Sequence, residues 1–415
     1  MDRHADTTPQ GTRAFRPRAA VTAMAPPAAG VHAALSLPHR ERIAKLDENE
    51  AVRPPSPRVR RALTDYAAGG ELNWYPDEAA AALRAALADY TGVGPEWIRV
   101  FPGADAALLT LARAFLESGD EVVWPPPSYE PFRECVDAAG GVLVPAPVLS
   151  IWEAEPGAVL TAITPKTRLA YLANPNNPTG TLYAADQIAA LLWACPDVGF
   201  VIDEAYYEFS GATAASLLLA HANLLIVRSF SPAYGLAGLR IGYVLSHPSN
   251  LAWLDRIRTG TGCSVPAQVA ACAALADQEY LRATVAETRL AMKTLSATLV
   301  RMGLDVHPTP ANFVLVRVDD PDAVCRFLAN RLIFVGNCNR IDGLSGYLRI
   351  AVGDTRTAER VVEAFRAMPS ALLFPAAPER RRITLDHAPE APAGHYRVSV
   401  DAAPMSRRAP ISRDP

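Results

Sequence analysis

Three short segments of the chain place polar side chains directly after apolar runs, where strands would end. Residues 174–180 read NPNNPTG, a cluster that can bind a ligand or simply form a turn. Residues 201–206 include Asp203. A carboxylate at the carboxyl end of a parallel strand lies at the ligand-binding edge of a sheet, although it can also cap a helix. Residues 229–243 combine hydroxyls, glycines and Arg240, which suit a phosphate. Together the segments indicate a site for a phosphate-bearing ligand.

The elements that would position these segments alternate between strands and helices. Short apolar runs separated by helical patterns lie at 98–101, 121–124, 169–172, 199–202, 224–228 and 241–245. This alternation predicts an α/β fold with a mostly parallel sheet covered by helices on both faces. Ser56 and Pro57 supply the N-cap and first-turn proline of one helix. A second helix is expected to start at Asp77 and to end at Gly92.

From about residue 275 the pattern changes to a smaller α+β unit. A long helix is expected first, then a strand at 313–318, a helix near 321–331 and a strand at 347–351. We therefore divide the chain into a flexible N-terminal arm (1–39), the N-terminal part of a small domain (40–70), a large domain (71–274), the C-terminal small domain (275–371) and a flexible tail (372–415). The two ends are rich in Ala, Pro and Arg without periodicity.

Composition excludes several classes of protein. The formal net charge of −3 indicates no excess of positive charge that would bind nucleic acid or an anionic membrane, so neither is expected as a partner. No apolar run approaches the roughly 20 residues that cross a bilayer. The six cysteines form neither CxxC pairs nor Cys/His clusters, so we expect no metal site and a reducing, cytoplasmic compartment. Lysine occurs only at Lys45, Lys166 and Lys293.

Further short motifs accompany the three segments along the chain. They are NWYPD at 73–77, GAD at 103–105, PPPSY at 125–129, NF at 312–313 and YLRIAVG at 347–353. In this order the motifs resemble the class I/II aminotransferase family of pyridoxal-phosphate (PLP) enzymes, most closely its histidinol-phosphate aminotransferase members. The resemblance covers roughly residues 40–370. It implies fold type I, with a large PLP-binding α/β domain and a smaller α+β domain.

The resemblance also implies a role for each matching residue. Asp203 would pair with the pyridine nitrogen of PLP, and Tyr129 would stack on its ring. Tyr206 and Asn177 would bond its phenolic oxygen. The residues implied around its phosphate are Gly103, Ala104, Asp105, Ser229, Ser231 and Arg240, with Tyr75 reaching the phosphate of a neighbouring subunit in a dimer. Arg349 and Asn312 would bind the substrate, Arg349 through a carboxylate.

The sequence departs from the family at position 232, where Pro232 replaces the lysine that forms the Schiff base. Proline has no amine to link covalently to PLP or to move a proton during catalysis. It also fixes its own φ near −65° and so could reshape the loop. We do not expect Lys45, Lys166 or Lys293 to reach the cofactor. A second departure is Gly336, because the closest family members carry a basic substrate-binding residue there.

Three functions therefore remain open. The first is an aminotransferase-like enzyme that acts on an amino acid or its keto acid. It would hold PLP or pyridoxamine 5′-phosphate (PMP) non-covalently, without an internal aldimine. The second is a catalytically inactive subunit that forms a heterodimer with a lysine-bearing paralogue instead of a homodimer. The third is a binding protein for a conjugate of PLP or PMP with an amino acid. Retention of Asp203, Tyr129 and Arg240 favours the first.

Overall fold

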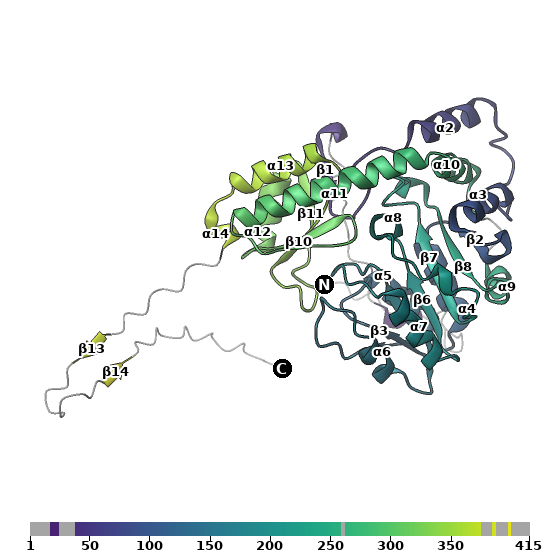
Figure 1. Cartoon of the computed structure of the whole chain (residues 1–415), viewed down its shortest axis with the longest axis horizontal. Coiled ribbons are helices and arrows are strands. Elements are labelled where there is room, and N and C mark those ends of the chain that lie inside the picture. Colours follow the sequence, from purple (N-terminus) through teal and green to yellow (C-terminus); the bar gives the residue numbers. More distant parts are fainter. Residues whose placement is uncertain (1–16, 25–37, 259–261, 375–383, 387–396, 400–415) are drawn as a thin grey trace, which may run out of the picture.

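A seven-stranded sheet forms the larger unit of the computed structural model, which describes residues 17–24, 38–258, 262–374, 384–386 and 397–399 (Figure 1). The strand order is β2-β8-β7-β6-β5-β3-β4. The bounds are β2 Ile98–Phe101, β3 Glu121–Trp124, β4 Val142–Pro145, β5 Thr167–Ala173, β6 Gly199–Asp203, β7 Leu224–Ser229 and β8 Gly242–Ser246. Strands β3 to β7 run parallel, and β8 is antiparallel to both β7 and β2. The predicted mostly parallel α/β sheet is confirmed, with the half-exposed edge strand β4 as an addition.

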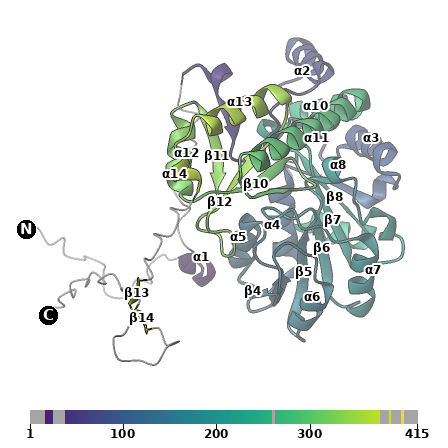
Figure 2. The ribbon, with the colours of Figure 1, turned by 60° about the vertical axis from the view of Figure 1, so that its left-hand side comes forward.

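Helices cover both faces of this sheet (Figure 2). Successive strand residues point to opposite faces, so Val201 of β6 packs into one core and Ile202 into the other. Helices α4 Ala104–Phe115, α5 Glu130–Ala139 and α9 Pro248–Ile257 cover the first face. Helices α3 Ala81–Thr91, α6 Pro156–Ala162, α7 Ala185–Ala194 and α10 Val265–Leu275 cover the second. The strand ends are therefore the part of the sheet left open for a ligand.

A five-stranded sheet in the order β1-β11-β12-β10-β9 forms the smaller unit. Its elements are β1 Ala44–Leu46, β9 Val306–Pro308, β10 Phe313–Arg317, α12 Pro321–Ala329, β11 Ile333–Asn337, β12 Tyr347–Ala351, α13 Thr355–Arg366 and α14 Ser370–Leu373. The long helix α11 Gln278–Arg301 joins the units, because Leu281 packs in the larger core and Leu299 in the smaller.

The structure corrects two sequence-based expectations near the N-terminus. Residues 40–70 were assigned to the small domain, but Val59 of helix α2 (Pro57–Gly69) packs in the core of the larger unit. Helix α3 begins at Ala81 and not at Asp77. The reason is local, because the Asp77 carboxylate accepts the Ala79 and Ala81 N–H groups at 2.9 and 2.7 Å and φ of Ala80 is 46°.

Most of the predicted flexible arm (1–39) and tail (372–415) lies outside the described residues. Short elements complete the part of the chain that is described. They are α1 Ala19–Ala23, η2 Arg40–Arg42, η3 Pro95–Trp97, α8 Tyr207–Ser210, η4 Ala215–Leu217, η5 Ala237–Leu239, β13 Thr384–Asp386 and β14 Arg397–Ser399. Next to α1, the Arg18 guanidinium donates to the Ala138 carbonyl on α5. Within these described ranges, every helix is too short or too polar to span a bilayer.

Candidate active site

A cavity of about 520 Å3 lies at the carboxyl ends of the parallel strands, with walls from both units. It gathers most of the residues proposed from the sequence. These are Ala104, Asp105, Tyr129, Asn177, Asp203, Tyr206, Ser229, Ser231, Pro232, Arg240 and Arg349. Gly103, Asn312 and Tyr75 are not among the lining residues. Chain segments separated by more than 200 positions therefore meet at one site.

Asp203 presents a buried carboxylate at the end of strand β6. The Tyr171 hydroxyl donates to its Oδ2 at 2.9 Å, and the Ala205 N–H donates to its Oδ1 at 3.1 Å. Burial raises the pKa of the Asp203 carboxyl to about 6, and these two hydrogen bonds oppose the rise. Such a group can pair with a cationic ring nitrogen, because a positive partner would offset the cost of burying the charge.

The first turn of helix α4 forms another wall of the cavity. The Arg240 Nη2 donates to Asp105 Oδ2 at 2.7 Å, and the Tyr129 hydroxyl donates to Asp105 Oδ1 at 2.8 Å. Gly103 precedes the helix with φ 93°, and a Cβ there would lie 2.9 Å from Arg240 Nη2. The glycine thus lets Arg240 approach the helix N-terminus, where free N–H groups and the helix dipole favour an anion.

Ser229 ends strand β7, and Ser231 lies on the loop between β7 and η5. The Ser231 N–H donates to Ser229 Oγ at 3.1 Å, which fixes the Ser229 hydroxyl relative to the Ser231 backbone. Pro232 follows directly, and it is buried while still lining the cavity. Two hydroxyls, one guanidinium and a helix N-terminus make this end of the cavity suited to a phosphate.

Tyr206 is positioned through the segment after β1. The Asn49 Nδ2 donates to the Tyr206 hydroxyl at 2.9 Å. Asn312 in turn donates from Nδ2 to the Asn49 carbonyl at 2.9 Å and is 1% exposed. Asn312 therefore supports Asn49 from behind the cavity wall. The sequence offered no motif that singles out Asn49.

Arg349 connects the two units at the cavity. Its Nη1 donates to Asn177 Oδ1 at 2.6 Å and its Nη2 donates to the Asp47 carbonyl at 2.6 Å. Each of these nitrogens carries two hydrogens, so one N–H of each remains for a ligand. The Gly336 backbone pairs with Arg349 across β11 and β12, and Gly336 adds no side chain to the cavity.

Tyr75 lies apart from this cavity and is 90% exposed. It shares a surface segment with Leu72 and Trp74, which are 66% and 69% exposed. Three large apolar side chains exposed in one short segment are typical of a protein–protein contact. The position of Tyr75 excludes it from the cavity of its own chain.

The sequence matches the profile of the class I and II aminotransferases over residues 41–365. The chain belongs to this family.

Individual aminotransferases show the same likeness over most of their length. A dihydroxyacetone phosphate transaminase from Campylobacter jejuni is 33% identical over 341 residues, covering 79% of this chain and 92% of that protein. A histidinol-phosphate aminotransferase from Ralstonia nicotianae is 40% identical over 326 residues, covering 75% and 85%. The structure of a histidinol-phosphate aminotransferase from Sinorhizobium meliloti, solved with pyridoxal 5′-phosphate, is 30% identical with a TM-score of 0.76 and covers 86% and 99%. These likenesses extend to both units.

The three lysines of the chain lie away from the cavity. Lys166 and Lys293 are exposed, the latter on helix α11. The Lys45 ammonium donates to Asp47 Oδ1 at 2.9 Å and to Glu50 Oε2 at 2.5 Å. Glu50 lines the cavity, but no lysine does within the part of the chain that the structure describes. The same described part contains no cluster of His, Cys, Asp or Glu that could hold a metal ion.

Sequence reasoning missed Tyr171, which contacts Asp203 from the neighbouring strand β5. Tyr171 is fully buried, and its ring stacks on Phe132 with centroids 4.0 Å apart. It lies within an apolar strand, where the sequence gives no reason to distinguish a tyrosine from other core residues. Only the pairing of β5 with β6, which sets Ala173 opposite Asp203, brings its hydroxyl to the carboxylate.

Proposed function

We propose that this aminotransferase-family protein binds PLP or PMP non-covalently and acts on an amino acid or its keto acid. The observation that carries the proposal is the composition of the cavity. It keeps a buried carboxylate, an anion-binding end and a free pair of arginine N–H groups, while Pro232 lines it instead of a lysine. A cavity that had lost its ligand would have no reason to keep all three together.

The residues present fit the cofactor. Asp203 would pair with the ring nitrogen, and Ser229, Ser231 and Arg240 would bind the phosphate together with the start of α4. Gly242 supports this fit, because a Cβ there would lie 2.8 Å from the Ala104 backbone nitrogen and push α4 away. When bound, the protonated ring of the cofactor withdraws electrons from a carbon joined to it through nitrogen.

The other side chains of the cavity would orient the ligands. Tyr129 would cover the ring face, while Tyr206 and Asn177 would bond the phenolic oxygen. Burial raises the pKa of Tyr129 and of Tyr206, so both hydroxyls stay protonated at neutral pH and can donate. Arg349 would bind a substrate carboxylate through the second N–H of Nη1 and of Nη2.

Pro232 leaves the protein without the amine that would hold the cofactor covalently and move a proton at the substrate carbon. The cofactor would therefore be retained by the contacts above alone, and it would leave the protein on dilution. An amino acid would have to arrive with the cofactor or to join it within the cavity. We accordingly place the chemistry outside the ordinary family route.

The test is a titration of the purified full chain with PLP, then with PMP, followed by visible absorption. We expect saturable binding, no cofactor retained after borohydride reduction and denaturation, and a new absorption band only with certain amino acids. Failure of both cofactors to bind would contradict the proposal. Binding without any spectral response or turnover across an amino-acid panel would favour a binding protein instead.

A second candidate is a partner subunit in the cytoplasm. The exposed Leu72, Trp74 and Tyr75 favour it, because this segment needs a second chain to cover it. In a homodimer, an identical chain would cover this segment. In a heterodimer, a lysine-bearing paralogue would cover it. Native mass spectrometry of the chain alone, and co-expressed with such a paralogue, separates the two.

A further inference from the structure

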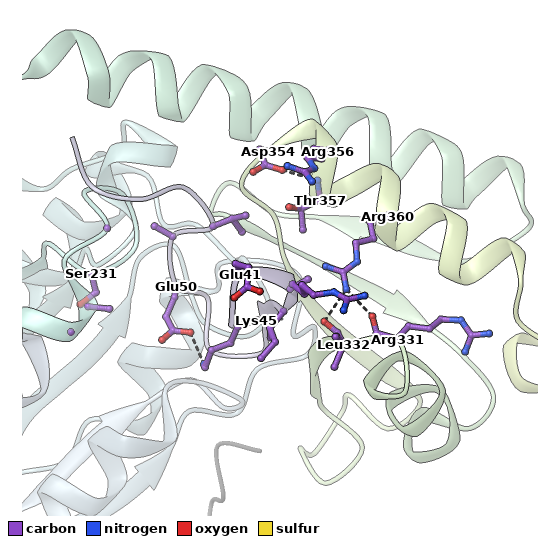
Figure 3. Close-up of a pocket in the computed structure, with 18 of the residues that line it drawn as sticks. Glu41, Lys45, Glu50, Ser231, Arg331, Leu332, Asp354, Arg356, Thr357 and Arg360 are labelled. Atoms are coloured by element: carbon purple, nitrogen blue, oxygen red, sulfur yellow. Dashed lines mark hydrogen bonds and ion pairs between the residues drawn. The ribbon is translucent and has the colours of Figure 1, made fainter. Parts of the chain in front are cut away.

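A second cavity, of about 890 Å3, lies beside the first (Figure 3). It is bounded by the N-terminal segment 41–52, by residues 330–332 and by the start of helix α13. Ser231, Gly238 and Glu50 line both cavities, so the two share a wall. Neither the sequence motifs nor the proposed cofactor accounts for this second cavity.

The second cavity has an excess of positive charge. Its charged lining comprises the cations Arg42, Lys45, Arg331, Arg356 and Arg360 and the carboxylates Glu41, Glu50 and Asp354. The carboxylates already have partners. Glu50 pairs with Lys45 at 2.5 Å, Glu41 with His39 at 3.4 Å, and Asp354 accepts the Thr357 N–H at 2.7 Å. Among the described residues, no ion pair joins any of these carboxylates to an arginine of the lining.

Arg42, Arg356 and Arg360 line this cavity together and form a cluster of like charge. Arg360 donates from Nη2 to the carbonyls of Arg331 and Leu332 at 2.7 and 3.3 Å, as Figure 3 shows. Burial lowers the pKa of Arg360, and the charges of Arg356 and Arg42 lower it further. In the described ranges of the chain, no ion pair involves Arg42, Arg356 or Arg360. Such repulsion is relieved when an anion binds between the guanidinium groups.

We propose that Arg42, Arg356 and Arg360 form a second binding site, for a small molecule that carries a phosphate monoester. Planar guanidinium groups bind phosphate oxygens in pairs, and a dianion matches the excess of two positive charges in the lining. The volume leaves room for an organic group toward Ser231 and Gly238. This site is independent of the cofactor proposal, because Arg240 and the start of α4 lie in the other cavity.

The test is isothermal titration of the full chain with glycerol 2-phosphate at constant ionic strength. Wild type should bind one molecule at a site that survives Arg240→Gln. The double variant Arg356→Gln/Arg360→Gln should raise the Kd at least about tenfold, because it removes charge-assisted hydrogen bonds. Arg366→Gln, an exposed position on the same helix, is the matched control and should leave the Kd unchanged. PLP binding followed by visible absorption should respond to Arg240→Gln and not to the double variant.

Three outcomes would overturn the site. They are no saturable binding in wild type, binding lost in Arg240→Gln but kept in the double variant, or malonate binding as tightly as glycerol 2-phosphate. If the double variant does not fold, as judged by circular dichroism, Arg42→Gln on η2 provides the same comparison. If the wild-type protein binds glycerol 2-phosphate but does not bind PLP, the result counts against the cofactor proposal alone.

Discussion

The Tyr171 hydroxyl donates to Asp203 Oδ2 at 2.9 Å, from the strand next to the one that carries the carboxylate. Both side chains are buried, and Tyr171 is held by its stack on Phe132. The hydrogen bond stabilises the ionised form of Asp203 against the burial that raises its pKa. We therefore expect Tyr171 to act as a positioning residue for the proposed cofactor, through Asp203.

Replacing Tyr171 by phenylalanine should shift the pH dependence of cofactor binding. Without the hydroxyl, the Asp203 carboxyl holds its proton to a higher pH, so the pH at which PLP affinity falls should rise by roughly half to one unit. PLP Kd values between pH 5 and 8 measure this shift. The variant Tyr183→Phe, at a tyrosine outside the cavity lining, is the control, and an equal shift there would contradict the role of Tyr171.

Asp203→Asn should stabilise the cofactor-free protein at neutral pH. The folded pKa of Asp203 is about 6, above its ordinary value of 3.8, so burial of this group costs nothing below pH 3.8 and its full cost above pH 6. The free energy of unfolding of the variant should therefore exceed that of wild type by roughly 2–3 kcal/mol at pH 8 and match it at pH 4. Urea unfolding at both pH values checks this, with exposed Asp342→Asn as the control.

The same Asp203→Asn variant should bind PLP at least about 10-fold more weakly at pH 8, because a neutral amide cannot pair with a cationic nitrogen. Below pH 5 the difference between the two proteins should narrow, since Asp203 is then protonated in wild type. Equal PLP affinity at pH 8 would place the ring nitrogen elsewhere. Visible absorption titrations at the two pH values provide the comparison.

Arg240→Gln should weaken PLP binding about 10-fold and leave pyridoxal binding unchanged. The reason is that Arg240 lies at the anion-binding end with Asp105, and pyridoxal lacks the phosphate. Asp105 loses its ion-pair partner in the variant, so the free energy of unfolding is measured in parallel. If the two ligands lose affinity to the same extent, the phosphate does not lie beside Arg240.

Arg349→Lys should weaken the response to amino acids while PLP affinity stays within about twofold. The lysine ammonium has three N–H donors on one nitrogen, so it cannot bond Asn177, the Asp47 carbonyl and both oxygens of a carboxylate, whereas the planar guanidinium can. The measurement is the amino-acid concentration that gives half of the spectral change in PLP-saturated protein. An unchanged value would show that the substrate carboxylate binds elsewhere.

Pro232→Lys should create a covalent link to PLP that borohydride reduction makes permanent. The Pro232 side chain lines the cavity, so an amine at this position can reach the ligand. Mass spectrometry of the reduced, denatured protein should show added cofactor in the variant and none in wild type. The variant Pro232→Met, which has a similar length and no amine, should remain unmodified. A reduced adduct in wild type would reveal a lysine that reaches the cavity.

Much of this protein is determined by local sequence. The apolar runs fix which residues can form the central strands, because strands buried on both faces need continuous apolar segments. The acid at position 203 and the proline at position 232 are properties of the sequence alone. So are the polar segments at the strand ends, since parallel strands bring their carboxyl ends to one edge.

The tertiary structure decided what these residues contact. Asn177 and Arg349 are 172 positions apart and meet only because the smaller unit packs against the strand ends. Tyr171 reaches Asp203 through strand register, and Asn49 reaches Tyr206 from the other unit. The three arginines proposed to bind the phosphate in the second cavity come from η2 and α13, and the local sequence of each helix is typical of a solvated surface. Long-range contacts depend on how elements pack, and no local pattern encodes that packing.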